Sequence, residues 1–222
     1  MTSLLGFASA ASGLAGVGVA GHWSTRRRDS LGRPRPFPKW SLLLLASLSV
    51  AAAVPGARRA IEERQLAQVA SQLVGHPVTV HCQSTAGALV DAGSELGFVP
   101  FDQDGVPLPT TTLKRDPCND LKRYLGGHRQ DPSYEEVVAV HVLTHESMHM
   151  RGATAEQVAE CEAVQRDRTT ASLLGATPAQ AEQLALRYWL TVYPGMPADY
   201  FSQDCKPGGR LDEHLPSAPW VH

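Results

Sequence analysis

The sequence lacks an excess of either charge. Its 222 residues include 20 Lys and Arg against 22 Asp and Glu, which gives a formal net charge of −2 at pH 7. A protein that binds nucleic acid usually carries a strongly basic face that neutralises phosphate groups. We therefore expect no nucleic-acid partner. No internal repeat is visible either, which argues against a repeat architecture.

Cysteine is scarce, and its spacing excludes the common cysteine-based zinc modules. The four cysteines are Cys82, Cys118, Cys161 and Cys205, and no two of them form a Cys-x-x-Cys motif. All four follow an apolar segment that predicts export to a compartment where disulfides are stable. Three connectivities are open, and we favour Cys82–Cys118 and Cys161–Cys205 because each bond then ties a segment to its neighbour. Four buried free thiols are the alternative.

One strongly apolar run stands near the N-terminus. It extends over residues 40–54 and is followed by Pro55 and Gly56. The basic residues that precede it are Arg26, Arg27, Arg28, Arg33, Arg35 and Lys39. A basic region before an apolar core is typical of a signal peptide or a signal anchor.

Two fates are open for this segment. The run is shorter than the roughly 20 residues of a membrane-spanning helix, which favours a cleaved signal peptide, and Ala51, Ala53 and Ala57 are the small residues that signal peptidase needs. A signal anchor over residues 39–57 is equally compatible. By the positive-inside rule it would hold residues 1–38, a basic and largely disordered leader, in the cytoplasm. In either case a juxtamembrane helix at residues 58–75 and a domain at residues 76–222 lie outside.

The pentad His145-Glu146-Ser147-Met148-His149 is the most informative motif in the chain. In a helix, two histidines four residues apart share one face, where both can reach a single Zn²⁺. The glutamate beside the first histidine can act on a metal-bound water molecule. A chance match somewhere in a chain of this composition has a probability of about 2%, so the surrounding sequence has to support the motif.

The flanking residues predict that the pentad lies in the last turns of a buried helix of about 20 residues. Asp131 is the expected N-cap, Pro132 the first helical residue, and Glu135 and Glu136 an acidic first turn. Apolar residues follow, and Gly152 is placed to end the helix. His141 continues the four-residue spacing, but His141 and His149 are about 12 Å apart along a helix. We therefore expect His141 to pack or hydrogen-bond near the site without ligating.

A catalytic zinc usually takes three protein ligands and a water molecule, so a third ligand is needed. Residues 154–157 have the form of a capping box, with Thr154 as the cap, and the helix that they open carries Glu156 and Glu160 on one face. We choose Glu156 as the ligand, and Glu160 is the alternative.

This part of the chain resembles the zincin metallopeptidases, and among them the glutamate-zincins, whose third ligand begins a Glu-x-x-Ala-(Asp/Glu/Asn) pattern. Residues 156–160 fit that pattern. The resemblance covers about 35 residues. It departs from the family in Arg151, which stands at a usually apolar position, and in the short connection between His149 and Glu156. Metzincins have a third histidine where this chain has Ala155, so they are disfavoured.

The resemblance implies a zinc-dependent peptidase, and the predicted export places its peptide or protein substrate in the cell envelope. His145, His149 and Glu156 would hold Zn²⁺, Glu146 would be the general base, and Glu160 would orient a histidine ligand. Tyr200, Arg210 and His214 are equal candidates for the group that stabilises the oxyanion. The alternative function is a non-catalytic extracytoplasmic binding module of the same fold.

We expect an α+β, mostly helical, minimal zincin-like domain with a small sheet packed on the motif helix. Strands are predicted at residues 77–82, 96–100 and 106–113, and helices at residues 116–125 and 178–192. Pro107 and Pro109 favour an edge position for the third strand, beside the cleft. The tail from Met196 is expected to be a loop tied down by Cys205.

Overall fold

The computed structural model describes residues 14–15, 17–24, 28, 31–33, 39–84 and 95–220. The chain divides into two units, residues 1–61 and 62–222. Most of the predicted leader at residues 1–38 lies outside the described residues. Helix α2 (Lys39–Val74) is the one helix in the described part of the chain that is long and apolar enough to cross a membrane. The predicted membrane segment and juxtamembrane helix both lie within it, and Pro55 does not end it.

The C-terminal part of α2 belongs to the second unit. It contributes Leu66, Val69, Ala70 and Val74 to the hydrophobic core. Their spacing places all four on one helical face, which explains why this part of the helix packs against the domain. The helix stops at Gly75, whose φ of +91° is accessible to glycine at little cost.

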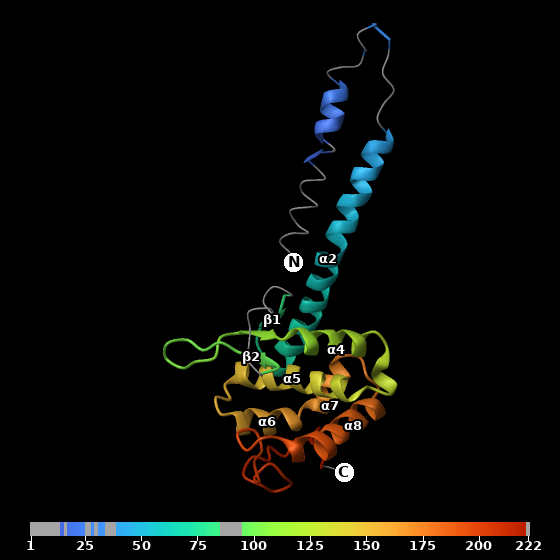
Figure 1. Ribbon diagram of the computed structural model, residues 1–222. Helices are drawn as coiled ribbons and strands as arrows, with labels where there is room; N and C mark the ends of the chain where they lie inside the picture. The colour runs from blue at the N-terminus through green and yellow to red at the C-terminus, as the bar shows by residue number, and fades with distance from the viewer. Residues whose placement is uncertain are drawn as a thin grey trace. The chain divides into compact units, whose positions relative to one another are not determined.

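The second unit is mostly helical with a small sheet, as predicted. Its helices are α4 (Arg115–Leu125), α5 (Tyr134–Arg151), α6 (Glu156–Val164), α7 (Asp167–Leu173) and α8 (Pro178–Arg187), with short helical turns at His128–Gln130, Tyr188–Val192 and Tyr193–Gly195. Figure 1 shows α5 running through the middle of this unit, with the sheet and α4 on one side and α6, α7 and α8 on the other. Because neighbours surround α5, nearly all of its residues are buried.

The sheet has the strand order β1-β3-β2, with β1 at Thr79–Cys82, β2 at Gly97–Phe98 and β3 at Thr110–Leu113. Strand β3 is parallel to β1 and antiparallel to β2. The prediction that residues 106–113 form the edge strand is therefore wrong, because their C-terminal half is the central strand. Pro107 and Pro109 precede β3, in the connection from β2 to β3. Neither proline therefore removes a backbone hydrogen bond between β2 and β3. The edge strand beside α5 is β2.

Two helix starts differ from the expected caps, and one agrees. The N-cap of α5 is Ser133, not Asp131: Ser133 and Glu136 form a capping box. The N-cap of α6 is Ala155, which gives no side-chain cap, so the predicted Thr154 box is absent. The side chain of Gln157 instead donates to the backbone oxygen of Ala198 in the tail. The capping box of Thr177 and Gln180 at the start of α8 is confirmed.

Both favoured disulfides are confirmed, Cys82–Cys118 and Cys161–Cys205. The second joins α6 to the C-terminal loop across a sequence separation of 44 residues. A crosslink that closes a loop of this size restricts the unfolded chain.

Replacing both Cys161 and Cys205 by serine should lower the free energy of unfolding by about 2–4 kcal/mol. Denaturant unfolding of the oxidised proteins measures this loss. The wild type treated with a reductant that opens both disulfides should lose at least as much. Equal stability of the double variant and the wild type would show that the bond does not constrain the loop.

Candidate metal centre

The pentad and the start of α6 bring three ligand atoms to one point. Nε2 of His145 lies 3.0 Å from Nε2 of His149 and 3.0 Å from Oε2 of Glu156, and the last two atoms are 3.3 Å apart. Bonds of 2.0–2.1 Å to a tetrahedral ion separate neighbouring ligand atoms by about 3.3 Å. The three residues therefore fit a metal ion in both donor type and spacing.

A backbone contact holds His149 in the orientation that a ligand needs. Nδ1 of His149 lies 2.7 Å from the carbonyl oxygen of Ala153, just after the end of α5. A carbonyl oxygen only accepts hydrogen bonds, so Nδ1 carries the proton. Nε2 is then left with its lone pair directed at the shared point.

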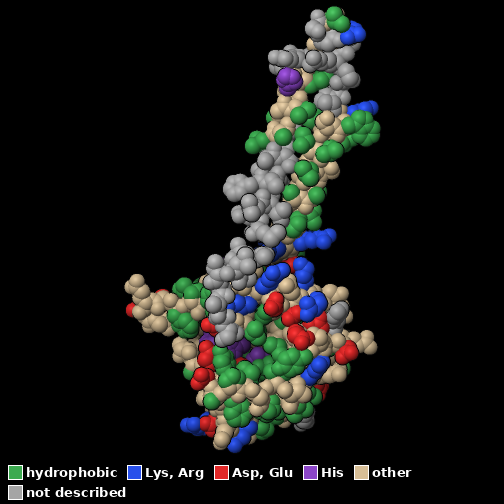
Figure 2. All heavy atoms as spheres, in the orientation of Figure 1, with side chains coloured by type: hydrophobic (Ala, Val, Ile, Leu, Met, Phe, Trp, Pro, Cys, Tyr) green, Lys and Arg blue, Asp and Glu red, His purple; other side chains and the backbone are tan. Residues whose placement is uncertain are grey.

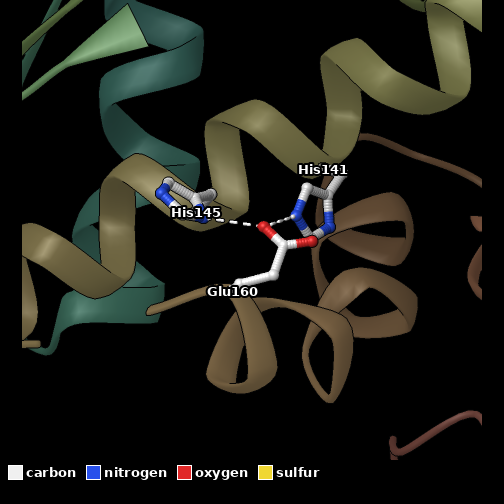
Figure 3. Close-up of side chains that lie close together, drawn as sticks. All are labelled: His141, His145 and Glu160. Carbon is white, nitrogen blue, oxygen red and sulfur yellow. Dashed lines mark hydrogen bonds and ion pairs between the residues drawn. The ribbon is translucent and has the colours of Figure 1, made fainter. Parts of the chain in front are cut away.

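A second group of ligand atoms lies on the other side of His145, as Figure 3 shows. Oε2 of Glu160 lies 3.0 Å from Nδ1 of His145 and 3.0 Å from Nε2 of His141. These three residues are buried and also have the donor types and proximity that a metal ion requires. The two groups share His145, which offers one ring nitrogen to each.

The two groups differ in their access to solvent. The side chain of Glu156 is 42% exposed, whereas that of Glu160 is 1% exposed. Figure 2 shows histidine side chains reaching the surface of the second unit among acidic and apolar side chains. The His145, His149 and Glu156 group therefore has an open side, and the His141, His145 and Glu160 group is sealed within the core.

Within the open group, the negative charge of Glu156 is balanced by protons on its histidine neighbours. Hydrogen bonds from His145 and His149 hold the pKa of Glu156 at about 2. Burial by itself lowers the pKa of His145, but the hydrogen bonds to Glu156 and Glu160 outweigh it and raise that pKa to about 9. A cation that binds between these groups would replace the proton of His145 and take over its stabilising role.

Glu146 contacts the sheet with its carboxylate and lies close to the ligand group. Its Oε2 lies 3.4 Å from Oγ1 of Thr111 on β3, and a side chain at Gly97 on β2 would meet its Oε1. Burial raises the pKa of the Glu146 carboxyl, and the neighbouring His145 and His149 partly offset this rise. A carboxyl group with a raised pKa beside a metal site is suited to accept and release a proton.

Gly97 is required by this packing. A Cβ at position 97 would lie 2.8 Å from Oε1 of Glu146 and 3.0 Å from two of its carbon atoms. We expect Gly97→Ala to displace the Glu146 side chain and to lower the free energy of unfolding by about 1–3 kcal/mol, as measured by chemical denaturation. The matched control is Gly195→Ala, because a Cβ there meets nothing within 4 Å. A Gly97→Ala variant as stable as this control would contradict the close contact.

The structure distinguishes the three candidates from the C-terminal tail. The ring of Tyr200 lies 5.8 Å from that of His145, centroid to centroid. Arg210 is exposed and pairs with Asp204, and His214 is exposed and lies 3.2 Å from Asp212. Burial and the nearby carboxylates of Glu156 and Glu146 raise the pKa of the Tyr200 hydroxyl, so it stays protonated at neutral pH. Tyr200 is therefore the candidate that the fold brings to the metal centre.

Several residues around the site were not predicted from the sequence. Asp167 and Tyr188 complete the buried network around His141 and Glu160, and Phe101 packs its ring 6.4 Å from that of His149. Tyr188 belongs to an apolar helical stripe, which predicted only a core position. Asp167 and Phe101 stand in no motif, so their place follows from the fold alone.

Comparisons of the chain with protein-family models, with curated proteins and with solved structures found no match.

Proposed function

We propose that this protein is a zinc-dependent peptidase that hydrolyses peptide bonds outside the cytoplasmic membrane. The observation that carries the proposal is the open group of three ligand atoms, all within 3.3 Å of one another, at one end of a helix that also carries Glu146. A hydrolytic metal needs three protein ligands, a free position for water and a nearby base.

The ion is assigned to His145, His149 and Glu156 rather than to the sealed group. His141 places both of its ring nitrogens against carboxylates, Nδ1 at 2.8 Å from Asp167 and Nε2 at 3.0 Å from Glu160. His145 likewise lies between two carboxylates, those of Glu156 and Glu160, so protonation does not separate the two groups. Access does: the side chain of Glu156 is 42% exposed and can meet a substrate, whereas that of Glu160 is 1% exposed.

Zinc suits this donor set best. Two imidazole nitrogens and one carboxylate oxygen in a tetrahedral arrangement are the ligands of several catalytic zinc sites, whereas magnesium and calcium prefer six or more oxygen ligands. When bound, zinc would supply Lewis acidity and lower the pKa of a water molecule.

Residues of the chain would carry out the proton transfer, stabilise the oxyanion and bind the substrate backbone. Glu146 accepts the proton of the attacking water and delivers it to the leaving amine, for which its raised pKa is suited. Tyr200 donates a hydrogen bond from its hydroxyl to the oxygen of the scissile carbonyl. Strand β2, at the edge of the sheet next to Glu146, offers its backbone to an extended peptide substrate, as edge strands of zincins do.

The role of Tyr200 gives a prediction that separates catalysis from binding. We expect Tyr200→Phe to lower kcat by about 10–100-fold, with KM and zinc affinity within about threefold, because the lost hydroxyl acts chiefly in the transition state. Steady-state kinetics on a fluorogenic peptide measures both constants. Arg210→Ala is the control, since Arg210 is exposed and pairs with Asp204. A Tyr200→Phe variant with unchanged kcat would remove Tyr200 from the mechanism.

The proposed location rests on two features. One helix is long and apolar enough to span a membrane, and two disulfides join the domain that follows it. Disulfides persist in oxidising compartments outside the cytoplasm. We place the domain outside the membrane, either anchored by α2 or released after cleavage, with proteins or peptides of the cell envelope as its substrates.

The full chain, purified in detergent with its disulfides intact, tests the function. We expect about one zinc per chain by mass spectrometry and cleavage of a peptide library that stops when a chelator removes the metal. Bound zinc without cleavage of any library member would favour the alternative, a non-catalytic binding module. Absence of metal binding would contradict both the zinc site and the peptidase.

A further inference from the structure

Glu160 is the centre of a buried polar network behind the metal group. Its Oε2 lies 3.0 Å from both Nδ1 of His145 and Nε2 of His141, as Figure 3 shows. Its Oε1 accepts a hydrogen bond of 2.7 Å from the hydroxyl of Tyr188. Both oxygens of a carboxylate that is 1% exposed are therefore engaged, as a buried carboxylate requires.

His141 stands in this network as a cation. Both of its ring nitrogens face carboxylate oxygens, those of Asp167 at 2.8 Å and of Glu160 at 3.0 Å. An ionised carboxylate only accepts, so each nitrogen has to donate, and an imidazole with two N–H groups is positively charged. Burial alone lowers the pKa of His141, but Asp167 and Glu160 outweigh it and raise that pKa to about 10. The ring also stacks on Tyr188 at 3.6 Å between centroids, a favourable place for a cation.

The contact between His141 and Glu160 bears on the tautomer of His145. Oε2 of Glu160 accepts the Nδ1 proton of His145, which leaves the Nε2 lone pair on the side of His149 and Glu156. The same oxygen accepts from Nε2 of His141, so His141 fixes the position of this acceptor. If the Glu160 side chain turned away from Nδ1, His145 could carry its proton on Nε2 instead, where it would block ligation.

We propose that His141, held by Asp167, is a positioning residue: its Nε2–H group donates to Oε2 of Glu160 and fixes that oxygen against Nδ1 of His145, so that Nε2 of His145 is free to bind the metal. The inference rests on the proposed function only in assigning the ion to Nε2 of His145. The proposal adds three residues to the site that do not bind the ion: His141 from α5, Asp167 from α7 and Tyr188 from the turn after α8.

Zinc affinity in a double-mutant cycle of His141→Gln and Glu160→Gln tests the proposal. We expect His141→Gln to weaken zinc binding by about 10–100-fold in the wild-type background. In the Glu160→Gln background the same change should cost less than about threefold, because the carboxylate that His141 positions is already absent. Competition with a fluorescent chelator measures the dissociation constants, and thermal unfolding of the metal-free proteins reports on the fold.

The matched control is Val137→Ala, which removes buried apolar atoms from α5 one turn before His141 and outside the network. Val137 lies in the hydrophobic core, so the variant disturbs the same helix and should leave zinc affinity within about threefold. If His141→Gln does not fold, Asp167→Asn takes its place in the cycle, with an expected weakening of about 3–10-fold.

Two results would overturn the proposal. Folded His141→Gln that binds zinc as tightly as the wild type would show that the contact of His141 with Glu160 is not needed. Equal losses in both backgrounds would show a purely structural role. If the wild type binds no zinc, both this proposal and the proposed function are contradicted. If the wild type and every variant bind zinc with the same affinity, only the role of His141 is contradicted.

Discussion

Replacing Glu146 by glutamine is expected to lower kcat/KM for peptide cleavage by about 10⁴-fold, or about 5.5 kcal/mol of transition-state stabilisation. The amide keeps the shape of the side chain but cannot accept the proton of the attacking water. Zinc content should stay at the wild-type level, because the Glu146 carboxylate contacts Thr111 and β2 and is not one of the three clustered ligand groups. Cleavage assays beside metal analysis measure the two quantities separately.

Glu162→Gln is the matched control for this variant. Glu162 is a partly buried glutamate of the second unit whose pKa, like that of Glu146, is raised first by burial, but it contacts Arg151 and lies outside the ligand group. The control should cleave peptides within about threefold of the wild type. A Glu146→Gln variant that keeps more than about a tenth of the activity would remove Glu146 as the general base.

The second large effect concerns the ligands themselves. We expect His149→Ala to weaken zinc binding by at least about 10³-fold, because one of three protein ligands is lost. Glu156→Gln should come close to this loss, since a neutral amide is a much poorer ligand than a carboxylate. Equilibrium dialysis against buffered zinc gives the dissociation constants of the purified variants.

Glu160→Gln separates the two groups that share His145. Glu160 touches Nδ1 of His145 and not the ligand atom, so its replacement should weaken zinc binding by only about 10–100-fold. The reverse order, with Glu160→Gln costing more than Glu156→Gln, would place the metal in the sealed group of His141, His145 and Glu160. The proposed site would then be wrong.

Local patterns in the sequence predicted much of the second unit. The pentad and the following Glu-x-x-Ala-Glu segment predicted a pair of helices, and α5 and α6 bring His145, His149 and Glu156 together as expected. The favoured disulfide pairing is confirmed as well. These features depend on residues a few positions apart, or on crosslinks between neighbouring segments, so local periodicity carries the information.

Features decided by tertiary packing were not predicted. The Thr154 capping box gives way to a hydrogen bond from Gln157 to the tail at Ala198, which lies 41 residues further along the chain. The edge position expected for residues 106–113 was wrong because β3 pairs with β1 across a long connection as well as with β2, and neither strand reveals its partner by composition. Local preferences are weak compared with such contacts.

The surroundings of the site show the same limit. Asp167 meets His141 across 26 residues of sequence, and Tyr200 reaches His145 from the C-terminal loop. His141 was expected near the site without ligating, and it does lie there, hydrogen-bonded to Glu160. Its two carboxylate partners, which make it a cation, could be identified only once the helices were placed.

A crystal structure of the zinc-loaded protein, with anomalous data collected at the zinc edge, tests the central claim most directly. We expect one strong peak at about 2.0–2.2 Å from Nε2 of His145, Nε2 of His149 and a carboxylate oxygen of Glu156, with a water molecule as fourth ligand. A peak between His141, His145 and Glu160, or a fourth protein ligand that closes the site, would contradict the claim that this centre activates water.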